Sequence, residues 1–269
     1  MTLSQRLRVK AGDTLKLADV DPAETHGLEK GPELEAALGA NIARLDELQY
    51  TMYAEHRRAL LVVLQGMDAA GKDGTIRHVM AGFNPQGCQV TPFKKPTPEE
   101  LAHDFLWRVH RVVPGKGDVA IFNRSHYEDV VVVRVHGLVP PRVWKQRYDQ
   151  INNFEQFLVE NDVVIVKLFL HISKEEQKKR LQRRLEDPKR QWKIAVNDFE
   201  DRKRWKDYMR AYEDALRECN PKEAPWYVVP ADKKWFRNLA VSQILVDTLE
   251  ALDMRFPPPA VDLKQIKLD

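Results

Sequence analysis

The sequence predicts an α/β fold built on a doubly wound, mostly parallel, five-stranded sheet with flanking helices and a helical lid. Three observations predict this fold. Short apolar runs alternate with segments of helical periodicity, a glycine-rich turn follows the first run, and a long basic segment follows the fourth. The chain has 269 residues, 43% of them hydrophobic, so we expect one domain spanning 1–269.

The apolar runs are the expected strands, and the segments between them are the expected helices. The strands are predicted at 59–65, 88–91, 119–122, 163–170 and 226–229. Long helices are predicted at 32–58, 143–160, 198–219 and 235–252. Thr97, Pro98 and Glu100 form a capping box that should start a further helix running through Val109.

The two ends of the chain lack this periodicity. Residues 1–30 are polar and should form a loosely ordered N-terminal arm, and the proline-rich residues 256–269 should form a peripheral C-terminal tail. The leucines at 34–48 give the helix over 32–58 an apolar stripe for packing on the sheet or on a second subunit.

Composition excludes several classes of protein. Basic residues exceed acidic ones by only three, so attraction for polyanions must come from local clusters. Cys88 and Cys219 are far apart and match neither a disulfide framework nor a zinc site. No membrane span or export signal is visible, so we expect a cytoplasmic protein without a membrane partner.

The glycine-rich turn after the first strand has the order strand, phosphate loop and helix. Backbone N–H groups in such a loop curl around phosphate oxygens, and Lys72 should neutralise charge on the transferred group. This order predicts a P-loop kinase-like core. The binding positions are Gly66, Ala69, Ala70, Gly71, Lys72, Asp73 and Gly74.

Asp73 stands where a phosphate loop usually has the serine or threonine that holds Mg²⁺. The metal arrangement should therefore be unusual, and Asp68 is the preferred carboxylate for direct metal contact. Asp73 either contacts metal or serves the start of the following helix.

A run of polar residues follows the strand at 119–122 and should lie near the phosphate loop. Asn123 occupies the place of the usual metal-binding aspartate, so Glu128 or Asp129 would supply the missing charge. The guanidinium of Arg124 suits a phosphate clamp, although an ion pair with either acid is the alternative. A solvated or hydrogen-bonded loop histidine at His126 is favoured over a phosphorylated one.

The basic segment at 173–204 is the expected lid, a helix–loop–helix that closes over a polyanion. Its arginines should lie on neighbouring exposed turns, and Arg180 and Arg184 are the preferred contacts. A solvated charged face is the alternative for each residue, and interleaved glutamates argue against a nucleic-acid partner. The predicted phosphate- and nucleotide-binding set also includes Asn123, Arg183, Lys193 and Arg202.

Four motifs together resemble the polyphosphate kinase 2 family over about residues 58–252. They are GMDAAGKDGTI, FNRSHYEDV, HISKEEQKKRLQRRLEDPKRQWK and APWYVVPADKKWFRN. The resemblance implies reversible phosphoryl transfer between inorganic polyphosphate and a nucleoside phosphate (AMP, ADP or ATP) on a thymidylate-kinase-like core. It also implies Mg²⁺, with Mn²⁺ as the alternative ion, and a homo-oligomer.

Roles follow from the resemblance by motif. Asp68 would organise the metal, Lys72 would grip the transferred phosphate, and Glu128 would help to place metal or nucleotide. Arg124, Arg180 and Arg184 would stabilise the transition state. Many members have aspartate where this chain has Asn123, and the asparagine pattern resembles that of members acting on both AMP and ADP.

Two other functions remain open at this point. One is an ATP-dependent nucleoside or nucleotide monophosphate kinase, against which Asp73 and the arginine-rich lid argue. The other is a regulator that binds nucleotide without catalysis, which would not need the clamp arginines. The sequence leaves open the polyphosphate chain length, the direction in the cell, the base, and whether Trp192 stacks on a base or anchors the lid.

Overall fold

The computed structural model, which describes residues 1–10, 12 and 15–266, contains a five-stranded sheet in the order β2-β3-β1-β4-β5. All four strand pairings are parallel. The strands are β1 (Ala59–Gln65), β2 (Cys88–Pro92), β3 (Val119–Asn123), β4 (Val163–His171) and β5 (Trp226–Pro230). The five predicted strands are confirmed, and β2 to β5 each extend one residue beyond the predicted end.

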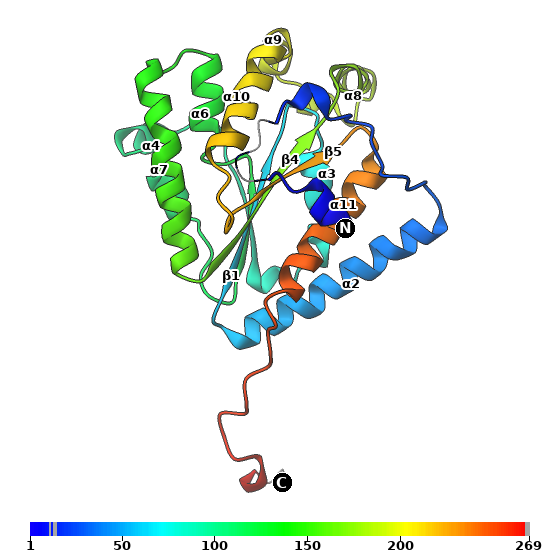
Figure 1. Cartoon of the computed structure of the whole chain (residues 1–269), viewed down its shortest axis with the longest axis vertical. Helices are drawn as coiled ribbons and strands as arrows, with labels where there is room; N and C mark the ends of the chain where they lie inside the picture. The colour runs from blue at the N-terminus through cyan, green and yellow to red at the C-terminus, as the bar shows by residue number, and fades with distance from the viewer. Residues whose placement is uncertain (11, 13–14, 267–269) are drawn as a thin grey trace.

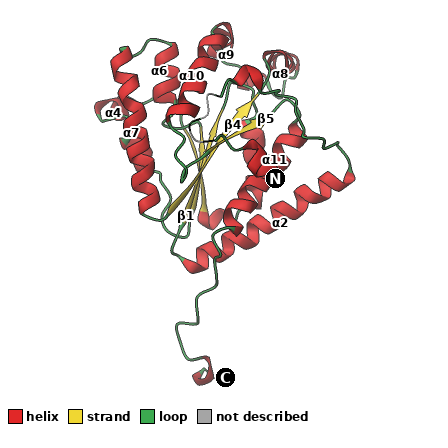
Figure 2. Ribbon diagram, in the orientation of Figure 1, coloured by secondary structure: helices red, strands yellow, loops and turns green. Residues whose placement is uncertain are grey.

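Helices cover both faces of the sheet (Figures 1 and 2). One layer contains α6 (Glu128–Val135), α7 (Pro141–Glu160) and α10 (Trp205–Glu218), and the other contains α1 (Leu3–Leu7), α2 (Pro32–Glu55), α3 (Lys72–His78) and α11 (Lys234–Glu250). Every residue of β1 is consequently buried, which explains why this strand reads as a continuous apolar run. None of the described helices is long and apolar enough to cross a membrane.

The remaining helices are short or belong to the predicted lid. They are α4 (Pro98–Ala102), α5 (Trp107–His110), α8 (Lys174–Glu186) and α9 (Val196–Lys203), with 3₁₀ turns at Leu17–Asp19, Met80–Gly82, Pro85–Gly87, Gln191–Lys193 and Leu263–Gln265. The capping box at Thr97 is present, but the helix it starts ends at Ala102 instead of continuing through Val109. The helix predicted at 198–219 is likewise wrong in its continuity, because the chain leaves helical geometry at Arg204.

The leucine stripe of α2 packs within the chain. Leu45 and Leu48 are buried, and α2 lies against α11. The C-terminal part of the apolar stripe thus covers this chain's own core, whereas Leu34, Leu38 and Ile42 stay half-buried.

The N-terminal arm is more ordered than the sequence suggested. Leu7, Val9 and Leu17 are buried in the main core, and Arg8 forms an antiparallel bridge with Tyr227 at the edge strand β5. The expectation of a loosely ordered arm is therefore wrong for these residues, because few but well-placed apolar side chains anchor them. Ala11, Asp13 and Thr14 lie outside the described residues.

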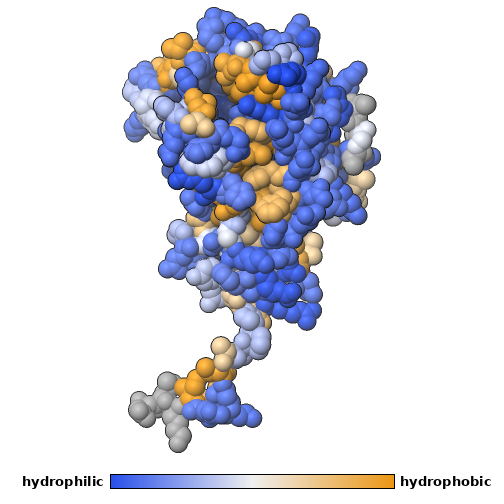
Figure 3. All heavy atoms as spheres, turned by 90° about the vertical axis from the view of Figure 1, so that its left-hand side faces the viewer, coloured by the Kyte–Doolittle hydropathy of each residue, from blue (hydrophilic) through white to orange (hydrophobic). Residues whose placement is uncertain are grey.

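The C-terminal tail leaves the body of the molecule after α11 and projects away from it (Figures 1 and 3). The ring of Phe256 meets that of Tyr50 edge-on at 5.7 Å between centroids. Beyond this contact the described residues to Ile266 are exposed, and 267–269 lie outside the described residues.

A buried ion pair lies between the sheet and α7. Lys167 of β4 and Glu155 of α7 are both fully inaccessible to solvent and form a salt bridge. The Lys167 ammonium also donates to the Tyr127 hydroxyl at 3.0 Å and to the Cys219 carbonyl at 2.8 Å. His126 contacts the same carboxylate at 3.2 Å, so it is a buried, hydrogen-bonded histidine as expected. Burial alone would raise the pKa of Glu155, but Lys167 and His126 stabilise its charged form and bring the pKa below its usual value.

We expect Lys167→Met to destabilise the fold by about 3–5 kcal/mol, because it leaves a charged carboxylate buried without its partner. Denaturant unfolding followed by circular dichroism measures the free energy of unfolding. The double variant Lys167→Met/Glu155→Leu should recover most of that loss, since it removes both charges. A loss below about 1 kcal/mol for the single variant would contradict this interpretation.

Candidate active site

The phosphate loop lies between β1 and α3, at the point where the chain order of the sheet diverges from β1 toward β3 on one side and β4 on the other. This is the crevice in which open parallel sheets bind ligands. Gly66 starts the loop with φ of +147°, and a Cβ there would lie 2.6 Å from the Leu170 carbonyl oxygen of β4. Glycine is thus required where the loop passes close to the neighbouring strand.

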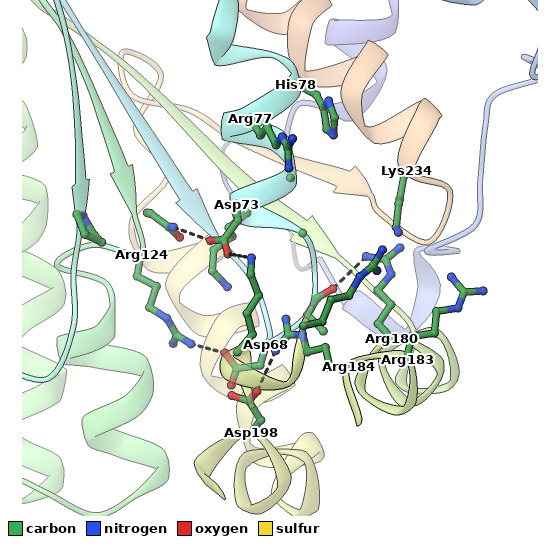
Figure 4. Close-up of a pocket in the computed structure, with 18 of the residues that line it drawn as sticks. Asp68, Asp73, Arg77, His78, Arg124, Arg180, Arg183, Arg184, Asp198 and Lys234 are labelled. Carbon is green, nitrogen blue, oxygen red and sulfur yellow. Dashed lines mark hydrogen bonds and ion pairs between the residues drawn. The ribbon is translucent and has the colours of Figure 1, made fainter. Parts of the chain in front are cut away.

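A cavity of about 960 Å³ opens beside the loop. The loop, the ends of β2 and β3, the lid and the first turn of α11 line it (Figure 4). Twelve lysines and arginines line this space, against four aspartates. Because the chain's charge is nearly balanced overall, this excess of basic residues is a local cluster, as the sequence required for attraction of a polyanion.

Lys72 is buried at the base of the loop. Its ammonium donates to the carbonyl oxygens of Gly66 at 2.7 Å and Met67 at 3.3 Å. Burial, assisted by the Arg124 guanidinium, lowers the pKa of Lys72 to about 8. The lysine is thus held inside the loop, where a phosphate would restore the favourable environment of its charged form.

Arg124 joins the phosphate loop to the end of β3. Its backbone has φ of +63°, and its guanidinium contacts the Asp68 carboxylate (Figure 4). It also pairs with Glu128 at 3.0 Å. The ion pair considered from the sequence therefore exists, with Glu128 and not Asp129. Asp129 instead pairs with Arg108 and Arg147.

Asp73 lies in the first turn of α3, where its charge favours the helix dipole, and it also makes two contacts that the sequence did not suggest. Its carboxylate accepts from the Asn123 amide at 2.9 Å and from the Lys193 ammonium of the lid at 3.1 Å. Neither contact is a helix cap, and α3 has no side-chain cap. Partial burial alone would raise the pKa of Asp73, but these two hydrogen bonds lower it overall. Asp73 thus connects the phosphate loop, β3 and the lid.

The lid consists of α8, a 3₁₀ turn and α9. Arg184 of α8 pairs with Asp198 of α9 at 3.0 Å inside the cavity, and Arg183 is exposed at its wall. The exposed position predicted for Arg180 is wrong, because this residue is only 7% accessible. Its guanidinium donates to the carbonyls of Ala69, Ala70, Ala231 and Asp232 and pairs with Glu176. Part of it still lines the cavity.

Four residues of the predicted set do not line the cavity: Gly66, Ala70, Glu128 and Arg202. Arg202 instead donates to the Lys174 carbonyl at 2.6 Å and the Gln177 side chain at 3.0 Å, which ties α9 to α8. Glu128 lies behind Arg124. The other predicted residues line the cavity: Asp68, Ala69, Gly71, Lys72, Asp73, Gly74, Asn123, Arg124, Arg180, Arg183, Arg184 and Lys193.

Sequence reasoning missed Asp198, Lys234 and Arg237, which also line the cavity. Burial and the Asp68 carboxylate raise the pKa of Asp198 to about 6. Nothing in the charged run around Asp198 distinguishes it. Lys234 and Arg237, however, follow the end of the fifth strand, and the rule that places ligands at strand ends would have found them.

Asp68 is the best-placed metal ligand because its carboxylate faces the cavity. The Glu128 Oε1 atom is buried and has no hydrogen-bond partner among the described residues. Those residues contain no group of three or more candidate ligands. Mg²⁺ commonly uses one or two carboxylates with substrate phosphates and water, so this donor set fits that ion.

Comparison with known proteins agrees with this geometry. Residues 29–257 match the family model for polyphosphate kinase 2. The AMP/ADP-polyphosphate phosphotransferase of Meiothermus ruber is 51% identical over 98% of this chain and 100% of its own length. The ADP-polyphosphate phosphotransferase of Rhodopseudomonas palustris is 44% identical, covering 94% of this chain and 92% of its own.

A solved structure shows the same fold. The crystal structure of polyphosphate kinase 2 from Arthrobacter aurescens superposes with a TM-score of 0.94 at 45% identity, covering 98% of this chain and 94% of that one. The chain belongs to the polyphosphate kinase 2 family.

Proposed function

We propose that this protein transfers a phosphoryl group from inorganic polyphosphate to AMP and to ADP, reversibly and with Mg²⁺. The observation that carries the proposal is the basic cavity, in which twelve cationic side chains surround the phosphate loop. The similarity to the Meiothermus ruber enzyme, named for both acceptors, supports the acceptor class.

Phosphoryl transfer needs positioning and charge stabilisation more than covalent chemistry. The loop N–H groups would hold one phosphate while Lys72 turns from the Gly66 and Met67 carbonyls to its oxygens. Arg124 and Arg184, both at the cavity wall, would neutralise charge that develops on the transferred group. An acceptor phosphate is already ionised at neutral pH, so no general base is required.

Arg180 would contribute differently from Arg184. Four backbone carbonyls and Glu176 already occupy all of its N–H donors, so its main effect is to hold the loop and α8 together. Its charge remains close to the loop, where it would add positive potential.

The lid would exclude water from the reaction. Lys193 reaches from the lid to Asp73 of the phosphate loop, and Arg184 meets Asp198 across the cavity. Closing these contacts around bound phosphates would strengthen every charge interaction inside and limit hydrolysis.

Mg²⁺ would be held by Asp68 together with phosphate oxygens, and Glu128, buried behind Arg124, would help to place the ion through that arginine. When bound, the ion supplies charge neutralisation between neighbouring phosphates. The chain's own residues set where that ion stands, because Arg124 holds both carboxylates in place.

The activity test uses purified protein with Mg²⁺, long-chain polyphosphate and either AMP or ADP, with chromatography of the nucleotides. ADP or ATP from AMP, and ATP from ADP, are the expected products. Lys72→Ala should lower kcat by about 10²–10³-fold while remaining folded, because its charge stabilises the transition state. Transfer from ATP but not from polyphosphate would overturn the proposal in favour of a nucleotide kinase, and no transfer from either would favour a regulator.

The pH dependence should report on Lys72. Its pKa in the free enzyme is lowered to about 8, so its charged form is present below that pH and is lost as pH rises through it. We therefore expect kcat/KM for polyphosphate to fall above about pH 8. Lys72→Arg should move the fall to higher pH, since guanidinium keeps its proton. A profile that stays flat to pH 9.5, or an unmoved fall in the arginine variant, would exclude this assignment.

Asn123→Asp should change the acceptor preference. The amide donates to Asp73 at 2.9 Å, and a carboxylate there would add negative charge to the cavity wall. The more highly charged ADP should suffer more than AMP, by about tenfold in the ratio of kcat/KM, or roughly 1.4 kcal/mol. Asn161→Asp, distant at the end of α7, is the charge-matched control. An unchanged ratio would rule out a role for Asn123 in acceptor choice.

A further inference from the structure

One cation beside the phosphate loop lacks a counter-charge. Arg237, in the first turn of α11, is only 2% accessible to solvent. Its guanidinium donates to the Asn238 side-chain oxygen at 2.8 and 3.2 Å and approaches the Ala70 carbonyl at 3.5 Å. No carboxylate lies within ion-pair distance of it in the described part of the chain. A buried charge without a partner is costly, so such a position in a native protein requires an explanation.

The guanidinium packs directly on the phosphate loop. A Cβ on Gly71 would lie 1.8 Å from Arg237 Nη1, and one on Gly74 would lie 3.1 Å from its Nη2. These two glycines therefore make room for the arginine as well as for a ligand. The loop has adapted its sequence to hold a cation against its own backbone.

Other cations surround this position. Arg180 is close enough that, together with burial, it lowers the pKa of Arg237 to about 10. Lys234 lies one turn earlier on α11, and burial, Arg180 and Arg183 lower its pKa as well. Figure 4 shows Lys234, Arg180 and Arg183 on the same side of the cavity, away from Asp68 and Asp198. The arrangement repels itself unless an anion is present.

We propose that Arg237, with Lys234, binds a phosphate of the polyphosphate chain next to the one held by the phosphate loop. The inference rests on the proposed function, because polyphosphate is the substrate whose successive phosphates would extend beyond the loop. An acceptor nucleotide does not need this position, since Figure 4 shows Arg124 on the opposite side of the loop from Lys234. Arg237 is thus a donor-binding residue, and it lies in the fourth motif, to which no role in the reaction had been assigned.

A structural role and a binding role predict opposite effects on stability. If Arg237 only braces the loop, Arg237→Gln lowers the melting temperature of the free protein. If it awaits an anion, removing the unpaired charge leaves that temperature unchanged or raises it, and instead reduces the stabilisation by tripolyphosphate. Thermal unfolding with and without tripolyphosphate, in the absence of nucleotide, distinguishes the two.

Kinetics of Arg237→Gln, Arg237→Lys and the surface control Arg44→Gln complete the test. We expect the glutamine variant to raise KM for polyphosphate about tenfold or more, and the lysine variant less, because each charged contact to phosphate is strong. KM for ADP should stay within about twofold in both variants, and Arg44→Gln should match the wild type.

An unchanged KM for polyphosphate, or a lower melting temperature with KM for both substrates rising equally, would overturn the role of Arg237. A failure of the proposed function would give a different result, because the wild-type protein itself would then transfer no phosphoryl group from polyphosphate to ADP.

Discussion

The guanidinium of Arg180 holds together the three parts of the molecule that form the cavity. It comes from α8 of the lid and donates to carbonyls of the phosphate loop and of the turn that follows β5. Five donors in a rigid plane can satisfy several backbone acceptors at once, which lysine could not do. The first lid helix is therefore fixed to the loop, and movement of the lid must arise beyond it.

The fixed attachment of α8 to the loop explains why the basic residues of the lid differ from one another in burial and bonding. Arg180 is buried and fully bonded, whereas Arg184 and Lys193 are partly exposed and held by single carboxylates, Asp198 and Asp73. Exchanging the exposed Lys193–Asp73 pair for a phosphate costs little, since such pairs contribute only about 0–1 kcal/mol. The residues best able to change partners are thus those farther along the lid.

The fold was predictable from the sequence because its signals are local. The strands are apolar runs buried on both faces, and the phosphate loop has a fixed order of glycine, lysine and helix. The buried position of Arg180 could also have been predicted, because Gln177, Arg180 and Leu181 share the inner face of α8 at helical spacing. The charged residues around Arg180 hide that periodicity, because together they resemble one solvent-exposed surface.

Other parts of the site could not be read from the sequence because they depend on pairings across the fold. Lys167 interrupts an apolar strand, which indicates a buried partner but not that the partner is Glu155. Asp198 becomes distinctive only when folding brings it near Asp68 and raises its pKa. The partner of Asp73 likewise could not be read from the sequence, because Lys193 lies 120 residues away. A carboxylate in place of the usual hydroxyl thus couples the phosphate loop to the lid, because its negative charge strengthens the hydrogen bond from the Lys193 ammonium.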